Sequence, residues 1–144
     1  MNFDHSLWGE IVPDGGDYCH WGGRRQSERL VSLLRVTPGD IVLEICCGRG
    51  GTLQLIHGAR LACGVDISEE ALRWARQKKL CAVRADALKL PFIQGAFSKI
   101  ISQDADVWMS DKVMLTRELY RVAASNCRLV IQTYAENTEI PTSL

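Results

Sequence analysis

Short apolar runs and helical patterns alternate along this 144-residue chain, and this alternation limits the possible folds more than any other feature. The apolar runs are rich in β-branched residues, as buried strands are, and cover 41–45, 61–65, 81–85, 97–102 and 128–133. Helical patterns cover 27–36, 52–57, 68–79 and 111–122. Strands that alternate with helices form parallel sheets with right-handed crossovers. The sequence therefore predicts an α/β fold, a Rossmann-like doubly wound parallel sheet of about five strands.

Two of the predicted helices carry clear start signals. Ser68 can cap the helix over 68–79, and the acidic residues after it suit the positive end of the helix dipole. Asp111 can cap the helix over 111–122 in the same way. The apolar spacing of this last helix predicts that it turns three side chains toward the core, those of Leu115, Leu119 and Val122.

Charge and hydropathy narrow the range of partners. Seventeen basic residues balance seventeen acidic ones, so no bulk field attracts nucleic acid or an anionic membrane. No apolar run is long enough to span a membrane, and the first sixteen residues, MNFDHSLWGEIVPDGG, lack the pattern of a signal peptide. The sequence predicts a cytoplasmic protein without nucleic-acid or membrane partners.

The six cysteines do not form a metal-binding pattern, because no C-x-x-C pair is present. Cys46 and Cys47 are adjacent, and neighbouring side chains on a strand point to opposite faces, which does not suit one tetrahedral metal. Several of the cysteines lie within apolar runs, where cysteine acts as a small buried hydrophobe. We therefore expect neither a metal site nor a disulfide framework.

Acidic residues follow the predicted strands at the point where each strand ends. Asp66, Asp86 and Asp104 come at or just after such ends, and Glu44 lies near the end of the first strand. The carboxyl ends of parallel strands meet at one edge of the sheet, which is where ligands bind in such folds. The acids therefore predict a ligand site at this edge.

The stretch LEICCGRGG places a glycine turn directly after the first strand. Gly48 and Gly50 let the backbone turn sharply and approach a ligand closely, and Asp66 can accept both hydroxyls of a ribose. A dinucleotide and S-adenosylmethionine both suit this arrangement. A dinucleotide fingerprint has a third glycine where Leu53 stands. Glu44 would repel a pyrophosphate but not the ammonium of a methionine group, so S-adenosylmethionine is favoured.

Four segments in order resemble the motifs of class I S-adenosylmethionine-dependent methyltransferases, specifically the small-molecule type that includes glycine, sarcosine and dimethylglycine N-methyltransferases. These segments are VLEICCGRGG, GVDISEEALRWAR, RADALKLPF and IISQDADVW. DYCHWGG resembles an amino-terminal segment that closes over the methionine end of the cofactor. The resemblance covers about residues 18–133. It implies S-adenosylmethionine as cofactor, S-adenosylhomocysteine as product and a small-molecule methyl acceptor, with an amine favoured.

The resemblance also implies roles for individual residues. Asp66 would hold the ribose, Ile67 would pack on the adenine, and Asp86 with Ala87 would lie near the adenine amino group. The full set of implied cofactor-binding residues is Glu44, Cys46, Gly48, Gly50, Asp66, Ile67, Asp86, Ala87, Gln103 and Trp21. Because the sulfonium is already an activated methyl donor, no dedicated nucleophile is required. The residues that could assist proton removal are His20, Tyr18 and Asp104.

Each of these roles has a purely structural alternative. Asp66 could simply start a helix, Asp86 could be a turn residue, and Asp104 could only terminate its strand. The aromatic segment over 18–21 could pack as a flap without touching a ligand. Trp74, on an amphipathic helix, is expected to pack rather than to bind.

The expected organisation is a flap or lid over 1–26 and a cofactor-binding core over 27–144. Three features depart from the family pattern. Cys46 stands where the family has a glycine beside the methionine end of the cofactor. A Ser-Asn-Cys sequence replaces a Pro-Gly-Gly turn, with Asn126 able to adopt the left-handed conformation. The chain ends soon after the fifth strand, so the C-terminal antiparallel strands of the family are missing.

Three hypotheses follow from this combination of features. The chain is a compact or split methyltransferase, completed at its open sheet edge by a homodimer partner or a complementing second chain. Alternatively, it is a methyltransferase-like binding or partner subunit without methylation activity. In the third hypothesis the same fold is reused for another small-molecule reaction.

Overall fold

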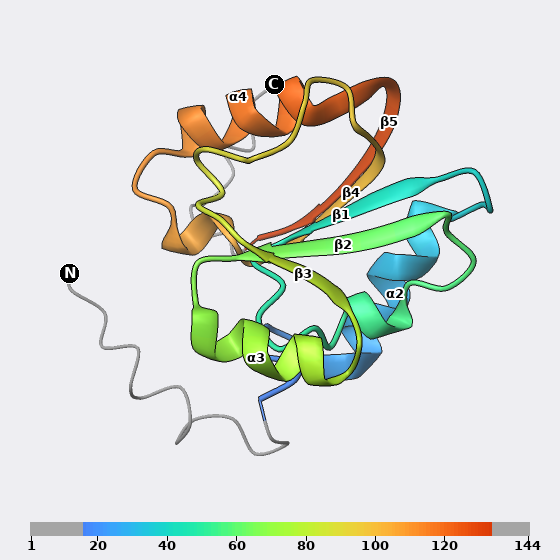
Figure 1. Cartoon of the computed structure of the whole chain (residues 1–144), viewed down its shortest axis with the longest axis vertical. Coiled ribbons are helices and arrows are strands. Elements are labelled where there is room, and N and C mark those ends of the chain that lie inside the picture. Colours follow the sequence, from blue (N-terminus) through green and yellow to red (C-terminus); the bar gives the residue numbers. More distant parts are fainter. Residues whose placement is uncertain (1–15, 134–144) are drawn as a thin grey trace, which may run out of the picture.

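The computed structural model describes residues 16–133 and shows one five-stranded sheet with helices on both faces (Figure 1). All neighbouring strands are parallel, in the order β3-β2-β1-β4-β5. The strands are β1 (Ile41–Ile45), β2 (Leu61–Asp66), β3 (Cys81–Arg84), β4 (Phe97–Gln103) and β5 (Ala123–Gln132). The helices are α2 (Gly23–Leu34), α3 (Glu69–Gln77) and α4 (Lys112–Val122), with 3₁₀ turns η2 (Leu53–Leu55) and η3 (Asp106–Trp108). The predicted doubly wound parallel sheet is confirmed.

The central strand β1 shows how the sheet divides the core into two layers. Leu43 and Ile45 belong to the cluster that includes Leu115 of α4, whereas Val42 packs with Leu34 of α2. The two layers follow from the alternation of side chains along a strand. In Figure 1, α2 and α3 accordingly lie on one side of the sheet and α4 on the other. Because both faces of β1 are covered, its sequence is apolar at nearly every position.

The two predicted helix starts are confirmed. The Ser68 side chain accepts a hydrogen bond from the Ala71 backbone amide at 3.2 Å, which caps α3. The Asp111 carboxylate accepts one from the Met114 amide at 2.8 Å, which caps α4. Both caps satisfy amides that have no partner within their own helix.

Three predicted boundaries are wrong. Helix α2 covers Gly23–Leu34 rather than 27–36, and the helix expected over 52–57 is only the turn η2. Strand β5 begins at Ala123, so Asn126 lies within a strand and has no left-handed backbone. The reason is that Ala123 already pairs with Phe97 of β4, and an irregularity in the register separates this pair from the regular pairing that resumes at Arg128.

The proposed lid is only partly described by the structure. Its residues 1–15 lie outside the described range, and its predicted boundary with the core, between 26 and 27, falls within α2. Over residues 16–133, none of the helices combines the length and the apolar character needed to cross a membrane.

Candidate cofactor site

The glycine turn after β1 is closely packed on one side and open on the other. A Cβ at Gly50, where φ is +80°, would lie 2.5 Å from Leu80, and a Cβ at Gly51 would overlap the Asp17 carbonyl. At Gly48, by contrast, no atom of the other described residues, its two chain neighbours aside, lies within 4 Å of the place where a Cβ would stand. Packing therefore fixes the turn at Gly50 and Gly51 and leaves space for a ligand at Gly48.

The Asp66 carboxylate holds this turn in place. One oxygen accepts a hydrogen bond from the Gly48 amide at 2.8 Å, and the other accepts one from the Ser68 amide at 2.9 Å. The structural alternative for Asp66, a residue that starts the next helix, is therefore present. A carboxylate offers about four lone-pair sites, so these two bonds leave capacity for the hydroxyls of a ribose.

Glu44 is a buried acid on the α2 side of β1, only 5% exposed. Burial, and next the charge of Asp66, raise the pKa of Glu44 to about 8, although a backbone hydrogen bond from Leu53 acts in the opposite direction. Its Oε2 atom has no hydrogen-bond partner within residues 16–133. An unpaired buried oxygen is costly, and a ligand that supplies a donor or a positive charge would remove this cost.

The residues assigned to adenine lie in different surroundings. Ile67 follows β2 and is 62% exposed, so its side chain is available for contact with a ring. Asp86 accepts a hydrogen bond from the Leu88 amide at 2.8 Å, as a turn residue does. Ala87 is buried in the core, where its side chain packs away from solvent.

A polar cluster of His20, Ser27, Thr52 and Gln103 joins the amino-terminal segment to the carboxyl edge of the sheet. Ser27 Oγ lies 2.9 Å from His20 Nε2 and 2.8 Å from Thr52 Oγ1. The Thr52 hydroxyl also donates to the side-chain carbonyl of Gln103 at 2.7 Å. Gln103 is thereby engaged within the protein, and Ser27 and Thr52 are site residues that the sequence analysis missed. A threonine directly after the glycine turn was the only available signal.

Asp104 lies beyond the end of β4 and is buried and only partly bonded. Its φ is +52°, a left-handed conformation that aspartate adopts more readily than most residues do. Its Oδ2 accepts hydrogen bonds from the Trp21 amide at 2.9 Å and from the Gln132 side chain at 3.0 Å, whereas Oδ1 has no partner among the described residues. A buried acid with an unpaired oxygen is costly unless a ligand supplies a donor.

The segment before α2 is tied to the core by its backbone and by one ion pair. Asp17 pairs with Lys78 at 2.6 Å, and the Trp21 amide binds Asp104 while the Trp21 ring is largely exposed. The rings of Tyr18 and His20 form a T-shaped contact, with their centres 6.1 Å apart. Burial is the main cause that raises the pKa of Tyr18. The segment thus lies beside the ligand edge.

Trp74 differs from the expectation that it packs. It is about half exposed, and the Arg49 guanidinium lies 4.9 Å from the centre of its ring. The reason is that Leu72 and Ala75 are the buried positions of α3, which turns Trp74 toward solvent. A cation–π contact therefore joins α3 to the glycine turn.

The adjacent cysteines have different roles in the turn. Cys47 is buried, and its sulfur occupies the space beside Gly64, where a Cβ would lie 2.5 Å away. Cys46 has φ of +54°, which explains why a glycine suits this position. Burial is the largest cause that raises the pKa of both thiols, that of Cys46 to about 12. Across residues 16–133, no three His, Cys, Asp or Glu side chains are grouped to hold a metal ion.

We predict that Cys46→Gly stabilises the protein and strengthens cofactor binding. Relief of the left-handed strain is worth about 1 kcal/mol, and removal of the side chain from the turn should increase the affinity for S-adenosylhomocysteine roughly fivefold. Thermal unfolding and calorimetric titration measure the two effects. Arg35→Gly is the matched control, because Arg35 has φ of +50° at the end of α2 and should alter stability alone. A weaker affinity in Cys46→Gly would show that the cysteine is an adapted part of the site.

The sequence of residues 42–126 matches the protein-family model described as a methyltransferase domain. The matched segment is more than half of the chain. The chain belongs to this methyltransferase family. The match begins in β1 and ends in β5, so it contains the glycine turn, Asp66, Asp86 and Asp104. The predicted recognition of a class I S-adenosylmethionine-dependent methyltransferase is confirmed at the level of the family.

Curated relatives of this methyltransferase-family chain are diverse. It is 35% identical over 124 residues to the malonyl-[acyl-carrier protein] O-methyltransferase of Legionella pneumophila. This alignment covers 81% of this chain and 43% of the relative. It is 31% identical over 114 residues to the norajmaline N-methyltransferase of Rauvolfia serpentina, covering 71% and 38%. The chain thus spans about half the length, or less, of these relatives. They do not share one acceptor, so the small-molecule N-methyltransferase type stays a prediction.

Solved structures show the same fold. A phosphoethanolamine N-methyltransferase 2 from Haemonchus contortus, in complex with phosphomonomethylethanolamine and S-adenosylhomocysteine, aligns with a TM-score of 0.74 and 22% identity. The alignment covers 81% of this chain and 30% of that one. The fold is therefore that of this methyltransferase structure, as the sequence predicted.

Proposed function

We propose that this protein transfers a methyl group from S-adenosylmethionine to a small-molecule acceptor, with an amine favoured. The observation that carries the proposal is the open turn at Gly48, bordered by Asp66 and by the unpaired buried oxygen of Glu44. The arrangement places an open turn and two acids at the carboxyl edge of the sheet, where ligands of such folds bind.

In this proposal each side chain recognises a different part of the cofactor. Asp66 accepts the ribose hydroxyls, Ile67 packs on the adenine, and Asp86 lies near the adenine amino group. Glu44 faces the positively charged methionine end, where the glycine turn leaves room for the backbone to approach. The cofactor supplies an activated methyl group, so the protein has to align an acceptor, exclude water and accept a proton.

Among the described residues, three buried oxygen atoms without a hydrogen-bond partner lie near the carboxyl ends of β4 and β5 and support an amine as acceptor. They are Asp104 Oδ1, Asp106 Oδ1 and Gln132 Oε1, whereas Glu44 Oε2 is assigned to the methionine end of the cofactor. Each would cost about 1 to 3 kcal/mol if left unpaired. A protonated amine offers several N–H donors and a positive charge, which suits this set better than a phenol or a carboxylic acid does.

The residues around this set provide candidates for proton removal. Asp104 has the free oxygen, and His20 lies in the adjoining polar cluster. The raised pKa of Tyr18 keeps its phenol protonated, so Tyr18 suits donation rather than the role of base. We further propose that the segment over 16–22, which is tied to the core beside the ligand edge, helps to exclude water from the site.

A second candidate function is a methyltransferase-like subunit without methylation activity, or the same fold reused for another small-molecule reaction. The specific observation in its favour is Cys46, which has a left-handed backbone at a position where the family has a glycine. An assay with labelled S-adenosylmethionine separates the candidates. Label should pass to benzylamine or ethanolamine and not to phenol or benzoate. S-adenosylhomocysteine binding without any transfer would favour the second candidate.

We also propose that a homodimer partner or a complementing second chain completes the enzyme at β5. This strand forms one edge of the described sheet, and its Leu129 and Ile131 side chains are about half exposed. Edge strands with exposed apolar residues are normally covered. Native mass spectrometry tests the idea, and an active monomer would contradict it.

The buried acid predicts how stability depends on pH. Because the pKa of Glu44 rises to about 8 in the folded state from 4.5, the folded protein keeps a proton that the unfolded chain loses. The free energy of unfolding should therefore fall as pH rises from about 5 to about 8, by a few kcal/mol at most. Urea denaturation at several pH values measures this. Glu44→Gln should remove that part of the pH dependence, whereas the exposed control Glu70→Gln should keep it.

A further inference from the structure

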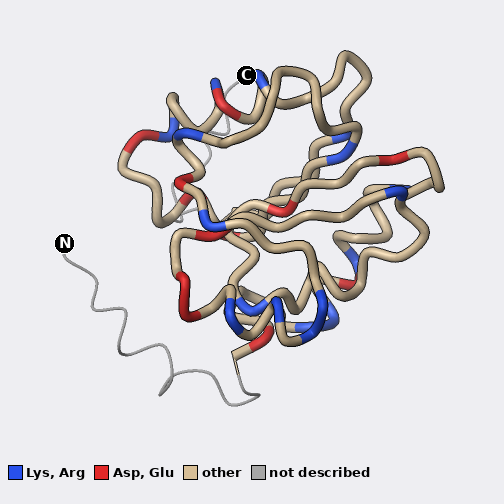
Figure 2. The backbone as a smooth tube through the Cα atoms, in the orientation of Figure 1, with Lys and Arg blue, Asp and Glu red and all other residues tan. Residues whose placement is uncertain are grey.

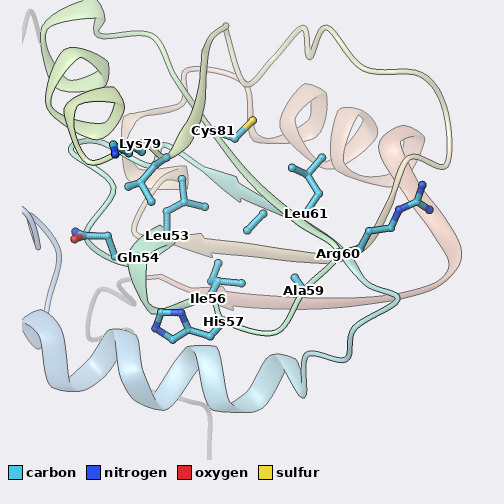
Figure 3. A pocket seen from close by; sticks show the side chains of 11 residues that line it. Leu53, Gln54, Ile56, His57, Ala59, Arg60, Leu61, Lys79 and Cys81 are labelled. Carbon is cyan, nitrogen blue, oxygen red and sulfur yellow. The ribbon is translucent and has the colours of Figure 1, made fainter.

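An open cavity of about 500 Å³ lies at the amino ends of β2 and β3 (Figure 3). This is the opposite end of the strands from the glycine turn and Asp66. The crossover from β1 to β2 supplies only the short turn η2 to the helical layer on this side. The cavity is therefore a consequence of a thin point in that layer.

The centre of the cavity is apolar. Its apolar lining consists of Leu53, Ile56, Ala59, Leu61, Ala62 and Leu80. Leu53 lies against Gly64, and Leu80 lies against Gly50, so packing on glycine positions holds these two walls in place. Leu61 is 46% exposed, which is unusual for the first residue of a central sheet strand. A ligand in the cavity would bury this exposed apolar surface.

The rim of the cavity is basic. His57, Arg60 and Lys79 line it, and no acidic residue does. Within residues 16–133, none of these three side chains has a hydrogen-bond or ion-pair partner. Figure 3 shows Lys79 and Arg60 on opposite sides of the apolar side chains, with neither head group over the centre. Figure 2 shows Lys and Arg gathered along α2 and α3 on this side of the molecule, although the net charge of the chain is zero.

We propose that this cavity binds a small amphipathic anion, whose apolar body fills the centre and whose carboxylate or phosphate group meets the basic rim. The volume is in the range of small-molecule sites. Because the charged side chains lie apart from the apolar lining, the cavity favours a ligand with an apolar body and a charged group at one end. Unpaired Lys and Arg side chains favour a negative charge on that group. The occupant is a free small molecule rather than a membrane lipid. The site does not depend on the proposed methyl transfer.

Calorimetric titration with octanoate and octyl phosphate tests the proposal, with octylammonium and octanol as comparison ligands. Both anions should bind once per chain with a submillimolar dissociation constant, and octylammonium should not bind. Lys79→Gln or Arg60→Gln, whichever removes the charge on the side that the anionic group occupies, should weaken the anions about tenfold. Arg117→Gln is the matched control, because Arg117 is an exposed arginine of α4 on the other side of the sheet.

Three outcomes would overturn the proposal: equal binding of octylammonium, unchanged affinity in both rim variants, or binding to phosphatidylglycerol vesicles without binding of free octanoate. Asp66→Ala separates this site from the cofactor site. Octanoate should bind this variant as it binds the unchanged protein, even if S-adenosylhomocysteine does not. Loss of octanoate binding in folded Asp66→Ala would place the anion at the cofactor edge instead and so contradict the proposal.

Discussion

Replacing Asp66 by alanine is expected to lower the affinity for S-adenosylhomocysteine about 100-fold or more. The carboxylate would accept two ribose hydroxyls, and hydrogen bonds to a charged group contribute roughly 1.5 to 3 kcal/mol each. Asp66 also bonds the Gly48 amide at 2.8 Å, so its removal loosens the turn that faces the methionine end. Calorimetric titration of the variant measures the combined effect.

A stability control is needed because Asp66 also holds the Ser68 amide. Asp66→Ala should therefore lower the free energy of unfolding by about 2 kcal/mol. Ser68→Ala removes the side-chain cap of α3, close to Asp66. It should lower the free energy of unfolding by about 1 kcal/mol and leave the affinity for S-adenosylhomocysteine unchanged. Unchanged affinity in a folded Asp66→Ala would show that the ribose lies elsewhere.

Replacing Asp104 by asparagine is expected to lower kcat/KM for an amine acceptor about 100-fold, with the affinity for S-adenosylhomocysteine unchanged. Removal of one member of a desolvated charge pair costs about 2 to 5 kcal/mol. Asparagine keeps the size of the side chain, tolerates the φ of +52° and retains an oxygen for the Trp21 amide. The expected loss is therefore one of charge rather than of shape.

Measurement of both constants identifies the role of Asp104. A rise in KM alone would indicate recognition of the amine, and a fall in kcat alone would indicate proton removal. Asp111→Asn is the matched control, because asparagine also caps helices and α4 should keep its start. Equal activity of Asp104→Asn and the unchanged protein would contradict an electrostatic role for Asp104.

The fold followed from local patterns alone. Apolar runs such as Ile41–Ile45 coincide with strands, and the caps at Ser68 and Asp111 have the expected partners. These features depend on residues close together in sequence, so periodicity and capping rules reveal them. β5 was predicted to begin too late because Ala123 extends the strand through an irregular pairing with β4, which no local pattern records.

The candidate site was predictable only in part. The acids at strand ends lie at one sheet edge, as the topology requires. Ser27 and Thr52 were missed, because α2 and the glycine turn meet each other and the predicted Gln103 only in the folded protein. The unpaired oxygens of Asp106 and Gln132 likewise depend on burial, which sequence does not show.

Titration of the unmodified protein with S-adenosylhomocysteine shows whether the open turn at Gly48, with Asp66 and Glu44, forms a working cofactor site. We expect one site per chain with a dissociation constant in the micromolar range, weakened at least 100-fold or so in Asp66→Ala. Absence of heat and of any stabilisation at millimolar ligand would contradict it.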